Sequence, residues 1–176
     1  MKRTIRLTAG LVATAALVAP SGLATAQPAK PDHSVKGQTK QLLKDIAGKD
    51  ARLDRMSTSD AVTRLADDTE ATLVANIGEA RTDLGEFKTA VEAADSTVDT
   101  KAVRKELRSF RVENFRIVAN VLAKAERLEE SAASDAEAVE HLTAAEDAAL
   151  AITATSTKAD IRAAREHVKA AQAELG

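Results

Sequence analysis

Proline is absent from the chain after residue 31, and this feature restricts the fold more than any other. Alanine, glutamate, lysine, arginine and leucine dominate the same region. Within a helix, proline costs about 3 kcal/mol and glycine about 1 kcal/mol relative to alanine. A long stretch without proline, with glycine only at 37, 48, 78, 85 and 176, is therefore typical of an all-α protein.

Apolar residues recur at spacings of three and four along this region, as one face of a helix requires. The pattern predicts helices over 38–56, 59–94 and 100–133, and a fourth segment, 135–175, that Thr153 to Thr157 divide in two. Ser57 with Asp60, and Thr157 with Asp160, have the spacing of a capping box at a helix start.

Short connections between helices of similar length favour antiparallel neighbours. We therefore expect residues 38–176 to form one domain, an elongated antiparallel helical bundle with coiled-coil-like packing. It would contain three long helices, the last one broken, and a short N-terminal helix. Residues 132–173 are rich in alanine and offer little bulky apolar surface to bury. A looser coiled coil that needs a partner chain is thus an open alternative.

The first 26 residues have the features of a secretory signal peptide. Lys2, Arg3 and Arg6 precede an uncharged run over 7–19, and Ala24 and Ala26 form a cleavage pattern before Gln27. Residues 27–37 then read as a flexible leader, and we expect a protein that is secreted or associated with the cell envelope. Removing the three basic residues of the signal leaves 22 basic against 27 acidic side chains, a net charge of −5. This acidic excess argues against nucleic acid as a partner.

Several classes of enzyme and metal protein are disfavoured by what the chain lacks. It has no cysteine, tryptophan or tyrosine, and no phosphate-binding loop or nucleophile elbow. We expect no enzyme activity and no cofactor. Glu137 and His141 share a helix face and form the one candidate pair of metal ligands. The same spacing is equally that of an ordinary surface pair.

Charge is strongly segregated over residues 101–116. Six basic side chains fall within an arc of about 140° when placed at 100° per residue, and Phe115 lies on the same side. They are Lys101, Arg104, Lys105, Arg108, Arg111 and Arg116. This stripe either binds an anionic polymer or surface, or pairs inside the bundle with the acidic side chains of residues 79–95. Asn114 is either a buried residue that sets register or an edge position of the apolar stripe.

Two stretches carry a family resemblance, namely residues 105–112 (KELRSFRV) and 160–171 (DIRAAREHVKAA). With the signal peptide and leader, the C-terminal part of the chain resembles uncharacterised secreted alanine-rich helical proteins of high-GC Gram-positive bacteria. The resemblance implies no activity. From the sequence we expect a non-catalytic exported helical module that makes helix-face contacts with a protein partner or with itself. The alternative is an electrostatic binder of an anionic wall polymer or membrane surface through residues 101–116.

Overall fold

Residues 33–176 are described by a computed structural model, and within them every regular element is a helix. The predicted all-α class is therefore confirmed. The helices are α1 (His33–Ser57), α2 (Asp60–Thr63), α3 (Asp67–Ala93), α4 (Thr97–Ser109), α5 (Glu113–Ala132), α6 (Ala136–Leu150) and α7 (Lys158–Glu174). None of these helices combines the length and the apolar character needed to cross a bilayer.

The predicted signal peptide, with its cleavage residues Ala24, Ala26 and Gln27, lies outside the described residues, as do leader residues 27–32. Helix α1 begins at His33, so residues 33–37, which were expected to belong to the leader, are helical. Near this end, Thr100 Oγ1 of α4 donates a hydrogen bond of 2.9 Å to Gln38 Oε1. That contact joins the N-terminal part of α1 to the first turn of α4.

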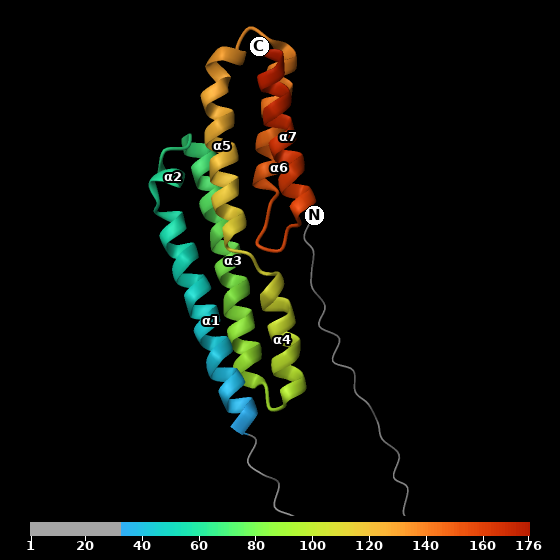
Figure 1. Ribbon diagram of the computed structural model, residues 1–176. Helices are drawn as coiled ribbons and strands as arrows, with labels where there is room; N and C mark the ends of the chain where they lie inside the picture. The colour runs from blue at the N-terminus through green and yellow to red at the C-terminus, as the bar shows by residue number, and fades with distance from the viewer. Residues whose placement is uncertain (1–32) are drawn as a thin grey trace, which may run out of the picture. The chain divides into compact units, whose positions relative to one another are not determined.

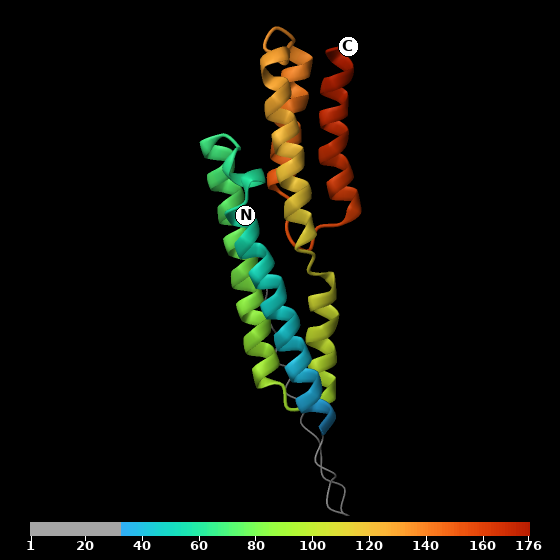
Figure 2. The ribbon, with the colours of Figure 1, turned by 60° about the vertical axis from the view of Figure 1, so that its left-hand side comes forward.

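The helices of residues 33–176 form two groups of three, which run roughly along one direction (Figures 1 and 2). One group is α1, α3 and α4, and the other is α5, α6 and α7. The N-terminal part of α3 and the short α2 connect the groups, since both contact α5 and α3 also contacts α6. The layout therefore differs from three long helices with a short one alongside.

The predicted helix over 59–94 is interrupted at residues 64–66, between α2 and α3. The Ser57–Asp60 capping box does not form, because the Ser57 hydroxyl bonds the Asp54 carbonyl instead. At the break, the backbone N–H of Ala66 donates a hydrogen bond of 2.9 Å to the Glu126 carboxylate of α5. A side chain distant in sequence thus binds the chain where α3 begins, and no local pattern could indicate it.

The predicted helix over 100–133 is also interrupted, at residues 110–112. The N–H of Arg111 donates a hydrogen bond of 2.7 Å to the Ala154 carbonyl in the α6–α7 loop. Asn114, at the start of α5, is 2% exposed, and its amide donates to the carbonyls of Thr153 (2.9 Å) and Ser156 (3.2 Å). Asn114 is therefore buried, as the first of its two alternatives predicted, and its two hydrogen bonds hold the α6–α7 loop. A role in setting helix register stays a prediction.

The core follows the predicted apolar pattern along α1, α3 and α7, and in α5 it also includes Phe115, Val118 and Leu122. In α3, Leu73, Ile77, Leu84 and Val91 are all buried. Between α6 and α7, alanines supply much of the contact; the fully buried ones are Ala138, Ala145, Ala149, Ala164 and Ala171. Small side chains let these two helices pack closely, and α5 also packs against both of them, so the alanine-rich segment is not left as an open face. The predicted Thr157–Asp160 capping box is present.

Candidate functional site

The break at residues 110–112 changes the surroundings of the predicted basic stripe. Phe115 was expected on the basic face, but it is 1% exposed and belongs to the core, so that prediction is wrong. The prediction assumed one continuous helix, whereas α4 ends at Ser109 and α5 begins at Glu113. The six basic residues themselves lie at the surface, all exposed except the half-buried Arg104.

The basic side chains of 101–116 do not pair with the acidic end of α3. Within residues 33–176, the ion pairs join Arg52 to Glu113, Arg64 to Asp60, Arg81 to Asp50 and Asp54, and Lys88 to Glu92. None of them includes a basic residue of the predicted stripe. The expectation that this stripe is neutralised by residues 79–95 therefore has no ion pair among the described residues to support it.

Arg104 and Arg108 instead face helix α1 across a groove of about 470 Å³. On the α1 side the groove is lined by Lys49 and Arg52, so four cationic side chains surround it. Its remaining lining residues are Gln41, Leu42, Asp45 and Leu107. Because α1 and α4 are distant in sequence, the fold and not the stripe alone brings these four charges together.

A second hollow, of about 420 Å³, continues the first along α1. Arg52 lines both hollows, and Arg55 and Arg116 add two more cations. The other lining residues of this hollow are Met56, Ser59, Val112 and Glu113. From Gln41 to Met56 the lining follows α1 for about 22 Å at 1.5 Å per residue. We call the two hollows together the basic groove; its cations are Lys49, Arg52, Arg55, Arg104, Arg108 and Arg116.

Two contacts hold the walls of the basic groove in position. Lys49 Nζ donates a hydrogen bond of 2.6 Å to the Phe110 carbonyl. Arg52 Nη1 lies 3.0 Å from Glu113 Oε1. Burial lowers the pKa of Lys49 below its usual value; Glu113 opposes this shift and Arg52 adds to it. Lys49 therefore serves chiefly to join α1 to the α4–α5 break, and the guanidinium groups are left to face solvent.

The groove is suited to binding anions. Guanidinium groups present fixed, planar sets of donors that match phosphate and carboxylate oxygens, and they remain charged at any physiological pH. A concave row of like charges also raises the local concentration of counter-ions. Asp45 and Glu113 are the acidic residues among its lining, against six cations.

Three predicted residues fall outside the basic groove. Lys101, Lys105 and Arg111 are exposed, but they line neither hollow. The sequence in turn missed the α1 contribution of Lys49, Arg52 and Arg55. Their spacing of three residues on one helix face was visible in the sequence. The sequence did not show that Arg104 and Arg108 of α4 lie opposite them.

The Glu137–His141 pair gains no further ligand of the expected kind. Residues 33–176 contain no group of three or more His, Cys, Asp or Glu side chains placed to hold a metal ion. The fold does bring His141 of α6 near His167 of α7, with ring centroids 6.1 Å apart. The two histidines are 26 residues apart in the sequence, so their proximity depends on the packing of α6 against α7.

The described residues thus define an all-helical protein with a cationic groove between α1 and the α4–α5 segment. The chain was compared with protein-family models, with curated proteins and with solved structures, and it matches none of them.

Proposed function

We propose that the protein is a non-catalytic exported binding module, and that its basic groove binds an anionic polymer of the cell envelope. The observation that carries this proposal is the convergence of six cations, from α1, α4 and α5, on two adjoining hollows. Arg104, Arg108 and Arg116 have no ion-pair partner within residues 33–176, so their charge is available to a ligand.

A polymer is favoured over a membrane surface as the ligand. Proteins that lie on a bilayer insert apolar side chains beside their cations. Phe115 was the residue expected to do this, and it is buried. The exposed large hydrophobic side chains of residues 33–176 are Val98 and Val139, and neither lines the basic groove. An extended, anionic chain matches the shape of the groove better than a flat surface does.

Helix-face contact with a protein partner, or self-association, receives less support. That mode of binding needs an unpartnered apolar stripe, and the stripes of α1, α3 and α7 are buried within the chain itself. Val98 and Val139, the exposed exceptions, belong to different helices, α4 and α6. We therefore expect a sedimentation measurement to give a monomer at all concentrations tested. A concentration-dependent oligomer would favour association as the function.

Coiled-coil-like packing, export through residues 1–26 and kinship with secreted alanine-rich helical proteins are parts of the same proposal. The packing is supported by the buried and half-buried residues of α3, which repeat at spacings of four and three, as in a heptad. They are Leu73, Ile77, Ala80, Leu84, Phe87 and Val91. Export is supported by the signal-like composition of the first 26 residues.

The proposal is tested by titrating the purified protein with long-chain polyphosphate, a soluble anionic polymer, at two salt concentrations. Each phosphate neutralised by a cation releases a counter-ion, so affinity falls steeply with salt. With about four contacts, the affinity should fall about 50-fold between about 50 mM and about 200 mM salt.

A parallel titration uses vesicles of phosphatidylglycerol and phosphatidylcholine. We expect polyphosphate to bind more tightly than the vesicles at equal phosphate concentration. A polyphosphate affinity that does not change with salt concentration, or no binding at low salt, would contradict the proposal. Tighter binding to the vesicles would indicate that the ligand is a membrane surface and not a polymer.

A further inference from the structure

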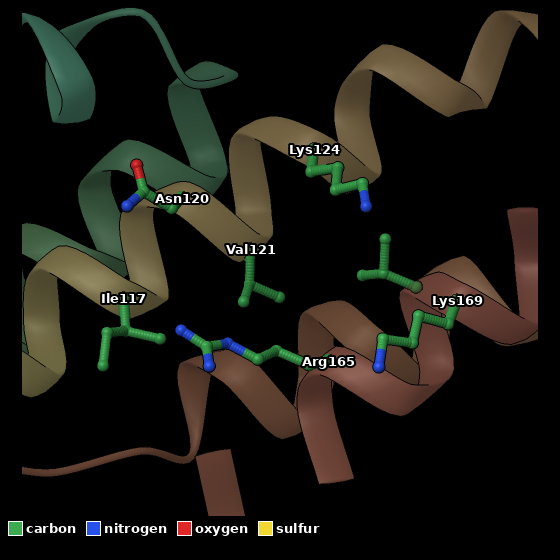
Figure 3. Close-up of a pocket in the computed structure, with 7 residues that line it drawn as sticks. Ile117, Asn120, Val121, Lys124, Arg165 and Lys169 are labelled. Atoms are coloured by element: carbon green, nitrogen blue, oxygen red, sulfur yellow. The ribbon is translucent and has the colours of Figure 1, made fainter. Parts of the chain in front are cut away.

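A second cationic cleft lies between α5 and α7, apart from the basic groove. It encloses about 220 Å³, and Figure 3 shows the side chains that surround it. Lys124 of α5 and Arg165 and Lys169 of α7 supply three positive charges. The remaining lining residues are Ile117, Asn120, Val121 and Val168, so no acidic side chain lines this cleft.

The floor of the cleft is apolar and its rim is charged. Val121 and Val168 are 5% and 2% exposed, and Ile117 is partly buried beside them. Arg165 extends across the cleft toward Ile117 and Val121 (Figure 3). A ligand in this cleft would therefore lie on aliphatic carbon, with cationic groups around it at the rim.

The grouping of these three charges is not explained by an ion pair. None of them takes part in an ion pair within residues 33–176. Arg165 and Lys169 are four residues apart on one helix, a spacing at which like charges repel. Lys124 is held toward α7 by a hydrogen bond of 2.8 Å from its Nζ to Gln172 Oε1. The fold thus maintains a repulsive cluster that an anion would relieve.

We propose that this cleft binds a small soluble phosphate monoester with a short aliphatic chain. The Arg165 guanidinium matches phosphate oxygens in geometry, and two ammonium groups complement a dianion. The aliphatic chain would cover Val121 and Val168. The volume is that of about seven water molecules at about 30 Å³ each, which suits a ligand of about the size of propyl phosphate.

The test follows the methyl resonances of Ile117, Val121 and Val168 by NMR while the protein is titrated with propyl phosphate. We expect saturable shifts at these methyl groups, and an affinity about tenfold higher than for inorganic phosphate because carbon is buried. Propanol, which lacks the charge, should cause no shift at the same concentrations. Equal affinity for inorganic and propyl phosphate, without methyl shifts, would overturn the proposal.

Two variants locate the ligand. Arg165→Glu should weaken propyl phosphate binding by about tenfold or more, since a charged hydrogen bond is lost. Arg162→Glu makes the same change at an exposed position of α7 outside the cleft, and should leave binding nearly unchanged. An equal loss in both variants would overturn the proposal. Circular dichroism verifies that each variant keeps its helix content.

The same phosphate chemistry occurs in lipid headgroups, so a further arm uses phosphatidylglycerol vesicles. We expect the vesicles to leave the three methyl resonances unperturbed. Shifts with vesicles but not with propyl phosphate would overturn the proposal that the ligand is soluble. The double variant Arg104→Glu, Arg108→Glu should retain propyl phosphate binding. Failure of polymer binding at the basic groove and failure of this second site are therefore separate results.

Discussion

Lys49 of α1 donates a hydrogen bond of 2.6 Å from Nζ to the backbone carbonyl of Phe110, the C-cap residue that follows α4. The same ammonium group lies 5.8 Å from the centroid of the Phe110 ring. That ring in turn packs edge-on against Phe87 of α3, with centroids 6.0 Å apart. One lysine therefore joins three helices at the break between α4 and α5, where a cation also complements the C-terminal end of a helix.

Replacing Lys49 by methionine should destabilise the protein. The variant keeps an unbranched apolar side chain but leaves the Phe110 carbonyl without its donor, which costs about 1–3 kcal/mol of unfolding free energy. Lys44→Met, at an exposed position of the same helix, should change the stability by less than about 0.5 kcal/mol. Urea unfolding measures both. Equal stabilities for the two variants would show that the Lys49 contact contributes nothing.

The stability of the protein should also rise with pH in the alkaline range. Burial lowers the pKa of Lys49 in the folded protein, while in the unfolded chain it returns to about 10.5. Between these two values the unfolded chain binds more protons, so the free energy of unfolding increases as pH rises. The chain has no tyrosine or cysteine to titrate in this window. Urea unfolding across this range should show the rise in the native protein and lose it in Lys49→Met.

Asn114→Ala should loosen the α6–α7 loop. The substitution removes both hydrogen bonds to the carbonyls of Thr153 and Ser156, and we expect a loss of about 1–3 kcal/mol. Amide hydrogen exchange should accelerate first around residues 151–157. Asn120→Ala, at an exposed position of the same helix, is the matched control. The role given to Asn114 fails if the two variants exchange at the same rate in this loop.

Asp83→Asn should stabilise the protein near neutral pH. Partial desolvation raises the pKa of Asp83, and Glu86 and Glu79 on the same helix raise it further. The charged form is thus disfavoured in the folded state, and stability falls as pH rises through this pKa. Removing the charge should relieve about 0.2–0.5 kcal/mol for each like-charged pair.

Asp68→Asn provides the contrast for Asp83→Asn, because Asp68 lies in the first turn of α3. There a negative charge favours the helix, so the same substitution should lower the stability. Thermal unfolding of the two variants at neutral pH compares them. A lower melting temperature for Asp83→Asn would contradict this account of the α3 charges.

The local features of the fold could be predicted from the sequence. The Thr157–Asp160 capping box and the α3 stripe depend on residues close together in the chain, and both are present. The break at residues 153–157 is equally local, since it is dense in polar cap-forming residues.

The two unexpected breaks depend on partners distant in sequence. Residues 64–66 leave the helix where Glu126 accepts the Ala66 N–H, and residues 110–112 leave it where Lys49 and Ala154 bind the backbone. Neither break contains proline or glycine. Once the second break shifts the helical phase, Phe115 turns from the expected basic face into the core.

The candidate site was found only in part for the same reason. The basic character of residues 101–116 was visible in the sequence, but the sequence did not show which of these residues line the groove. Arg104 and Arg108 line the groove with α1, whereas Lys101 and Lys105 do not. Only the packing of α1 against α4 separates these two pairs.

That separation provides the most direct test of the basic groove. The double variants Arg104→Glu, Arg108→Glu and Lys101→Glu, Lys105→Glu make the same charge change on the same helix. Polyphosphate affinity of each is measured at low salt, with helix content verified by circular dichroism. If the groove is the binding site, the first variant loses at least about tenfold more affinity than the second, because it removes two charged contacts. An equal loss would mean that the polymer responds to the charge of α4 as a whole. That result would contradict the proposal that the basic groove is the binding site.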